Sequence, residues 1–105
     1  MVALMAKGAV LFVALLASAA YAGASNFTLV NGTSAQLADL SIRRAGTQDW
    51  KPLGAAPAAG ARGSVKFTDP DCAFAIRATV PGAGPVTWAD VNLCDEKSVT
   101  LKSDQ

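Results

Sequence analysis

Apolar and polar residues alternate with a period of two through most of the chain beyond residue 25. This pattern is typical of strands that bury one face and expose the other. In residues 73–80, for example, Phe74 and Ile76 fall on one face and Arg77 falls on the other. Six segments show the pattern: Asn26–Asn31, Leu37–Arg44, Ser64–Thr68, 73–80, a strand that begins at Val86, and Ser98–Lys102. Their spacing predicts an all-β domain, a small antiparallel β-sandwich of about six short strands.

Two of these strands are expected to form a hairpin. The segment between them, Pro81-Gly82-Ala83-Gly84-Pro85, is rich in turn-forming residues. Folding the chain about Ala83 predicts three opposed pairs: Val80 with Val86, Ala78 with Trp88, and Cys72 with Cys94. Strict alternation would then turn Val91 outward, so we expect a β-bulge near Ala89-Asp90 that shifts the later residues by one.

Two further local features are predicted in the first half of the domain. The strand Asn26–Asn31 ends at Asn31-Gly32, a dipeptide that favours tight turns. In the strand Leu37–Arg44, the inner face is expected to hold Ala38, Leu40 and Ile42.

Residues 1–22 show no such alternation, because they are almost entirely apolar and carry Lys7 as their only charge. A positive start, an apolar run and the closing Ala20-Tyr21-Ala22 describe a secretory signal peptide. We expect it to be helical and to be cleaved between Ala22 and Gly23, with a cut after Ala24 as the alternative. An uncleaved membrane anchor fits less well, because a spanning helix needs about 20 apolar residues, whereas the uncharged run from Gly8 to Ala24 is at the lower limit and is diluted with Ala, Gly and Ser. The predicted organisation is a signal peptide, 1–22, and one domain, 23–105, that is periplasmic or secreted.

The charge and composition exclude several functions. The chain has 9 Lys+Arg, 8 Asp+Glu and no His. Since one of the basic residues is Lys7, the domain itself carries no net charge to attract nucleic acid or anionic lipid. Without His or a recognisable catalytic motif, we expect no enzyme activity, no cofactor and no metal ion. The pair Asp69-x-Asp71 is interpreted as a turn cap rather than a calcium site, because the remaining ligands of a calcium-binding loop are missing.

Cys72 and Cys94 are the only two cysteines. An isolated pair in an exported domain predicts a structural disulfide. A metal site would need further ligands, and a redox pair usually has C-x-x-C spacing.

The longest irregular segment is 45–63, which is rich in Ala, Gly and Pro and contains Trp50. Trp50 has two interpretations that the sequence leaves open: packing against the edge of the core, or exposure as a contact for a partner. It is therefore the candidate partner contact.

Three strings carry a family resemblance: N-F-T-L-V-N-G-T at 26–33, C-A-F-A-I-R at 72–77 and W-A-D-V-N-L-C at 88–94. Together with Trp50, they resemble a group of small exported bacterial proteins with an N-F-x-L-V-N opening strand and a W-x-x-hydrophobic-N/D-L-C ending. The resemblance implies a small β-sandwich. Some members carry the label argininosuccinate lyase, which we reject, because such lyases are large helical oligomers. This chain departs from the group in its Ala- and Gly-rich loop, where the relatives are more acidic.

These observations predict a non-enzymatic binding or structural module of the bacterial periplasm or cell envelope. We expect a protein or envelope partner, no nucleic acid, no membrane span after cleavage, and a monomer or weak dimer. The alternative is a secreted inhibitor or immunity-type protein that acts through the 45–63 loop.

Overall fold

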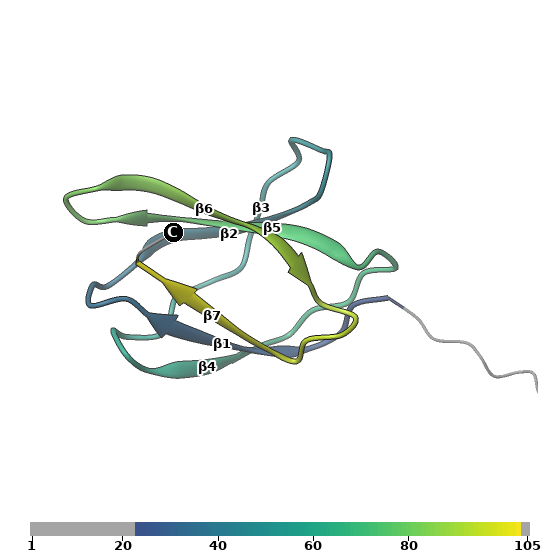
Figure 1. The fold of residues 1–105 in the computed structure, drawn as a ribbon, viewed down its shortest axis with the longest axis horizontal. Helices are drawn as coiled ribbons and strands as arrows, with labels where there is room; N and C mark the ends of the chain where they lie inside the picture. The colour runs from purple at the N-terminus through teal and green to yellow at the C-terminus, as the bar shows by residue number, and fades with distance from the viewer. Residues whose placement is uncertain (1–22, 104–105) are drawn as a thin grey trace, which may run out of the picture.

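The computed structural model describes residues 23–103, so the predicted signal peptide, including Ala22, lies outside the described residues. The described part is an all-β fold in which two sheets face each other (Figure 1). One sheet has the order β4-β1-β7 and the other β3-β2-β5-β6. The strands are β1 (Phe27–Gly32), β2 (Ala38–Arg44), β3 (Lys51–Pro52), β4 (Arg62–Val65), β5 (Ala73–Val80), β6 (Gly84–Asn92) and β7 (Ser98–Lys102). Among residues 23–103 there is no helix long and apolar enough to cross a membrane.

The core lies between the sheets and consists of the inward-facing residues of each strand. Leu29 of β1, Ile76 of β5 and Leu101 of β7 have no exposed surface. Burying such side chains contributes about 1.5–3 kcal/mol each to folding. Trp88 also faces inward, as predicted, and its indole N–H donates to the carbonyl of Lys102 at 2.8 Å. The predicted period-two burial and the all-β class are confirmed.

The hairpin β5–β6 forms with a register two residues away from the predicted one. Ala78 lies opposite Val86 and Ile76 opposite Trp88, because the chain reverses over residues 81–83. Gly84 therefore belongs to β6 rather than to the turn. A shift of two preserves the inner and outer faces, so the predicted burial survives the error.

The predicted bulge in β6 is confirmed. The register shifts by one between the pairs Ile76–Trp88 and Phe74–Val91, and Asp90 has a φ of +60°. Val91 is consequently 7% exposed.

A second bulge, in β2, was not predicted. The register shifts between Ala38 and Ser41, where Asp39 has a φ of +53°. The extra residue turns Leu37 inward and leaves Ala38 exposed. The expectation that Ala38 lies in the core is therefore wrong.

Two strand pairings in the sandwich have no corresponding pattern in the local sequence. β3 has only two residues and pairs with β2, and β7 pairs with β1 in the parallel direction. The predicted turn at Asn31-Gly32 is wrong, because Gly32 is still part of β1 and lies opposite Lys102. A Cβ on Gly32 would come within 2.9 Å of the carbonyl oxygen of Leu101, so this close approach requires glycine.

Asn31 is fully buried and joins the two crossover connections of the sandwich. Its side-chain amide N–H groups donate to the carbonyls of Ala35 at 2.9 Å and Pro57 at 3.0 Å. Its side-chain oxygen accepts from both the backbone N–H and the hydroxyl of Thr33, at 3.0 and 2.6 Å. Residues 33–37 lead from β1 to the other sheet, and residues 53–61 lead back from β3 to β4. One side chain therefore fixes both connections.

The first two described residues pack into the fold. Ala24 is 4% exposed, and its N–H donates to the carbonyls of Asp69 and Asp71 at 2.7 and 3.1 Å. Gly23 has a φ of +65°, and a Cβ there would meet the Asp69 carbonyl oxygen at 2.1 Å. Glycine is therefore required at position 23.

The predicted disulfide between Cys72 and Cys94 is present, with a Cα–Cα distance of 5.1 Å. It joins the start of β5 to the segment after β6, next to the main-chain hydrogen bond from Leu93 N–H to the Cys72 carbonyl. The bond therefore closes the open end of the hairpin.

Replacing both cysteines, Cys72→Ala with Cys94→Ala, is expected to lower stability by about 3 kcal/mol, because a loop of this length becomes free in the unfolded chain. For a domain of this size, the melting temperature should fall by more than about 10 °C. Thermal unfolding followed by circular dichroism measures the change, and wild type melted with a reductant is the matched comparison. Equal melting temperatures for the double variant and the oxidised wild type would contradict the stabilising role of the disulfide.

Candidate functional site

Two consecutive arginines end strand β2, and their side chains go to opposite sides of the sheet. Arg43 has the parity of the outward-facing Ser41, whereas Arg44 has that of Ile42 and contacts Asp69 on the segment between β4 and β5. Strand alternation alone produces this divergence. The end of β2 therefore contributes to two different surfaces.

The outer surface carries a stack of three side chains, Arg43, Trp50 and Arg77, which we call the Arg–Trp ladder. The guanidinium carbons of Arg43 and Arg77 lie 5.0 and 4.0 Å from the centre of a Trp50 ring. Both distances are in the range of cation–π contacts. β3 positions the indole, because Lys51 pairs with Ile42 and so places the preceding Trp50 beside Arg43.

Trp50 is half-buried but is not part of the hydrophobic core. It lies on the outer face of the four-stranded sheet, whereas Leu53 in the same segment does pack against the core. Ala75 pairs with Arg43, faces away from the core and is nevertheless 3% exposed, which is consistent with cover by the ladder. Of the two interpretations from the sequence, packing at the core edge describes Leu53 rather than Trp50.

The hydrogen-bonding groups of the ladder are only partly satisfied. The Arg43 Nη1 group donates to the carbonyl of Thr47 at 2.5 Å, but its buried Nε has no hydrogen-bond partner among the described residues. Arg77 makes no side-chain hydrogen bond or ion pair with any residue of 23–103 beyond its stacking on Trp50. Within the described part of the chain, neither guanidinium forms an ion pair with a carboxylate.

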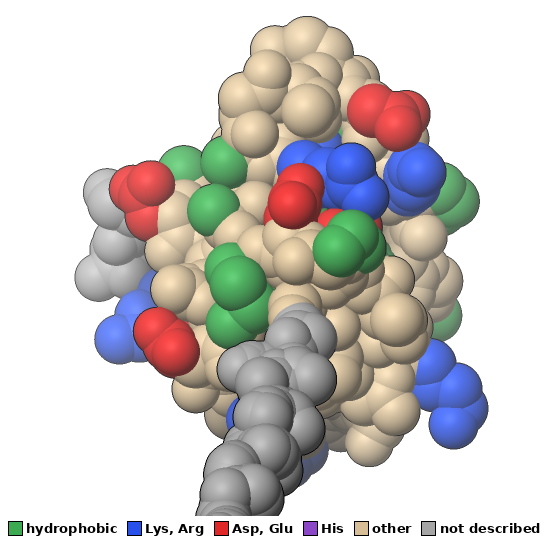
Figure 2. Space-filling model, turned by 90° about the vertical axis from the view of Figure 1, so that its right-hand side faces the viewer, with side chains coloured by type: hydrophobic (Ala, Val, Ile, Leu, Met, Phe, Trp, Pro, Cys, Tyr) green, Lys and Arg blue, Asp and Glu red, His purple; other side chains and the backbone are tan. Residues whose placement is uncertain are grey.

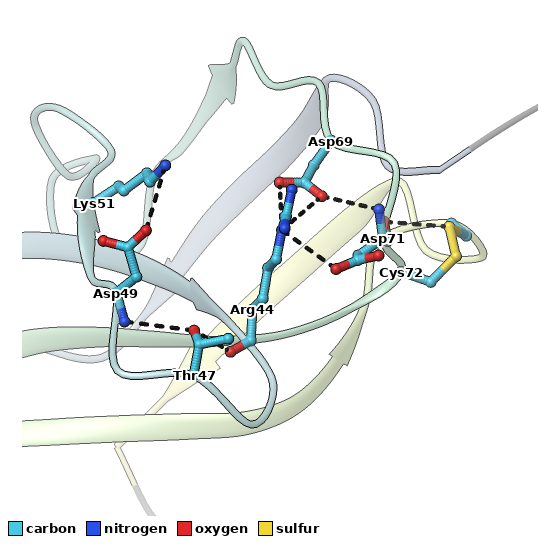
Figure 3. Close-up of polar contacts among 8 residues, drawn as sticks. Arg44, Thr47, Asp49, Lys51, Asp69, Asp71 and Cys72 are labelled. Carbon is cyan, nitrogen blue, oxygen red and sulfur yellow. Dashed lines mark hydrogen bonds and ion pairs between the residues drawn. A yellow bond between two sulfur atoms is a disulfide. The ribbon is translucent and has the colours of Figure 1, made fainter.

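On the other side, Arg44 is surrounded by acidic groups (Figure 3). Its Nε lies 3.1 Å from an oxygen of Asp69 and 3.3 Å from one of Asp71. Asp69 also accepts the N–H of Asp71 at 2.9 Å, which confirms the turn-capping interpretation of Asp69-x-Asp71. Figure 2 shows blue basic and red acidic side chains gathered on one face of the molecule, below the part that projects at the top of the view.

The pKa of Asp69 lies below its ordinary value as the net result of opposing effects. Partial burial raises it, whereas the hydrogen bond from the Asp71 backbone N–H and the contact with Arg44 lower it more. Asp69 is therefore a structural carboxylate that stays ionised, rather than a group prepared for proton transfer.

A cavity of about 150 Å³ lies behind this cluster, with an apolar floor of Ile42, Phe67 and Phe74. The rings of Phe67 and Phe74 meet edge to face, with centroids 5.3 Å apart. Arg44 and Lys51 are at the rim, but both contact carboxylates: Asp69 for Arg44 and Asp49 for Lys51. The cavity therefore offers an apolar surface with a balanced charged rim.

The sequence singled out Trp50 but not the arginines that hold it. The alternation pattern held part of the information, because it predicts that Arg43 and Arg77 both point outward from their strands. The structure adds that these two strands are neighbours. Within residues 23–103, no three His, Cys, Asp or Glu side chains come together in a metal-binding arrangement. Comparison of the chain with protein-family models, curated proteins and solved structures found no match.

Replacing Asp69 with asparagine tests the ion pair without removing the turn cap, because the asparagine oxygen can still accept from Asp71. Because the pKa of Asp69 is lower in the folded protein than in the unfolded chain, its ion pair stabilises the fold fully above the unfolded-state pKa near 4. This stabilisation is lost as the pH falls through the folded-state pKa. Asp69→Asn should therefore lower stability at pH 7 by about 1 kcal/mol or less, and this difference should shrink towards pH 3.

Urea unfolding at pH 7, 5, 4 and 3 measures this difference. Asp49→Asn is the matched control, because the Asp49 side chain is 74% exposed and its one ion pair within residues 23–103 is with Lys51, at 3.5 Å. If the difference in unfolding free energy between wild type and Asp69→Asn stayed constant across this pH range, the stabilising role of the Asp69–Arg44 ion pair would be contradicted.

Proposed function

We propose that this chain is an exported, non-enzymatic binding module of the bacterial periplasm or cell envelope, whose contact surface is the Arg–Trp ladder. The observation that carries the proposal is the position of Trp50. A large aromatic side chain outside the core, contacted by two arginines on a sheet, resembles the residues that dominate binding energy at protein interfaces.

The scaffold around the ladder supports a binding role. Each of its three residues comes from a paired strand or the position next to one, so the side chains are presented by a sheet rather than a free loop. Presentation on a sheet reduces the entropy lost when a partner binds. The non-enzymatic part of the proposal rests on the sequence, which has no His and no recognisable catalytic motif.

Export is supported by the disulfide and by the first residues of the domain. A small domain closed by a disulfide is typical of an oxidising compartment. Ala24 belongs to the core and Gly23 occupies a position that only glycine fits, so a cut before Gly23 retains both residues. A cut after Ala24 would remove them together with two main-chain hydrogen bonds.

Expressed with its leader in a bacterium, the protein is expected to be recovered from the periplasm or medium with Gly23 as its first residue. Intact-mass spectrometry measures the terminus and also shows whether two hydrogens are lost to the disulfide. A recovered protein that begins at Ser25, or one that keeps residues 1–22, would contradict this prediction.

The contact surface is tested by site-specific photo-crosslinking in living cells. A photo-crosslinking residue at Gln48, which is exposed on the β2–β3 connection beside Trp50, is expected to trap a partner. The same residue at Ser64, exposed on β4 of the other sheet, is the matched control. Trp50→Ala should reduce the product at Gln48 at least tenfold, because removal of a central aromatic contact costs about 2 kcal/mol or more.

The proposal fails if Gln48 and Ser64 give the same products, or if Trp50→Ala leaves the Gln48 product unchanged. Circular dichroism of the Trp50→Ala protein separates loss of contact from loss of folding, since Trp50 is outside the core.

The alternative, an inhibitor acting through the 45–63 loop, has less structural support. Much of that segment is attached to the body: β3 pairs with β2, and the carbonyls of Ala56 and Pro57 accept hydrogen bonds from Gln36 and Asn31. Only the part between β2 and β3 projects from the sandwich (Figure 1).

A further inference from the structure

Within residues 23–103, the two arginines of the ladder lack acidic partners, although Arg44, the residue after Arg43, has two. Arg44 lies within 3.3 Å of Asp69 and Asp71. Arg43 and Arg77 form no ion pair within residues 23–103. All three residues are arginines, so the difference in ion pairing comes from their surroundings. Among the described residues, positive charge is balanced by carboxylates on the inner side of β2 and is not balanced on the outer side.

Two carboxylates on the segments that carry the ladder are already engaged. Asp49 contacts Lys51 at 3.5 Å, and Asp39 accepts a hydrogen bond from the Thr79 hydroxyl at 3.3 Å. Bringing two guanidinium groups to one indole without a counter-charge is unfavourable unless an anion arrives.

The stacking leaves hydrogen-bond donors unused. A guanidinium that lies over a ring uses its face, while its five N–H groups lie in its plane and stay available. Arg77 makes none of these bonds within the described residues, and the Nε of Arg43 has no partner although it is buried. Buried donors are nearly always paired, so this set points to an acceptor that completes it.

The position of the guanidinium groups over the Trp50 indole limits which kinds of ligand can supply the acceptor. Two guanidinium groups already lie over the Trp50 ring, so a sugar or a nucleic-acid base would have to compete with them for a stacking surface. Two arginines are also fewer than the four to eight basic residues of a typical anionic-lipid site. A protein segment bearing carboxylates fits the remaining chemistry, because the planar donor fork of arginine matches a carboxylate.

We infer that the Arg–Trp ladder binds two carboxylates of an acidic, extended segment of a partner protein; this inference rests on the function proposed above. Both guanidinium groups lie over the Trp50 ring, so they are separated by no more than their two ring distances combined. Alternate side chains of an extended strand are about 7 Å apart. The matching pattern in the partner is therefore an acidic residue at every second position, with one carboxylate for each arginine.

The probe is the peptide acetyl-Thr-Glu-Thr-Glu-Thr-amide, titrated into the labelled protein at low salt. Nuclear magnetic resonance follows the Nε–H signals of Arg43 and Arg77 and the indole N–H of Trp50. The Glu peptide is expected to bind at least ten times more tightly than the same peptide with Gln, and 0.5 M NaCl should weaken its binding about tenfold.

Variants locate the interaction. Arg77→Gln should abolish the difference between the two peptides, and Arg77→Lys should weaken Glu-peptide binding because it keeps the charge but loses the fork. Arg62→Gln is the matched control, since Arg62 is exposed on β4 of the other sheet, and should leave binding unchanged. Equal binding of the Glu and Gln peptides, no binding of the Glu peptide, or equal effects of Arg77→Gln and Arg62→Gln would overturn the inference.

Crosslinking at Gln48 separates this inference from the proposed function. A partner that is trapped there equally by wild type and by Arg77→Gln would retain the contact surface and overturn the carboxylate site. Binding of the Glu peptide without any partner trapped at Gln48 would support the site and overturn the proposed function.

Discussion

The arrangement of the two sheets depends on the buried hydrogen bonds of Asn31. Four bonds to its side chain connect the end of β1 to the segment that crosses to β2 and to the segment that returns from β3. A buried amide with unmet partners would cost about 1–3 kcal/mol per lost group. Because the core is small, this cost is a large fraction of the stability of the domain. Asn31 therefore favours one relative placement of the sheets over its alternatives.

That placement leaves the space between the sheets filled by aliphatic side chains, phenylalanines and Trp88. Trp50 lies on the opposite face of the four-stranded sheet, where β3 brings it beside Arg43. The two tryptophans thus have different surroundings: Trp88 is enclosed by the core and donates to the Lys102 carbonyl, whereas Trp50 is bounded by charge. The short strand β3 connects the fold to its candidate contact surface.

The sequence predicted what depends on neighbouring residues and missed what depends on distant ones. Alternation located β5 and β7, and a conflict in that alternation located the bulge at Asp90. The parallel pairing of β7 with β1 and the short β3 have no local pattern, since each is decided by how distant segments pack. Trp50 was recognised as a candidate, but its stacking partners required knowing that β2 and β5 are neighbours. The register error of two in the hairpin was harmless, because parity alone decides which side chains are buried.

The disulfide has a consequence for the export proposed above. The segment 69–72 makes three contacts: a main-chain hydrogen bond with Ala24, an ion pair with Arg44 and the disulfide with Cys94. Several parts of the domain therefore meet next to the disulfide. A reducing cytoplasm keeps such thiols reduced. Under the export proposed above, a newly made chain would therefore lack this covalent closure until it had crossed the membrane. Oxidation on the far side would then stabilise the folded form, so the order of the two events would give the proposed export its direction.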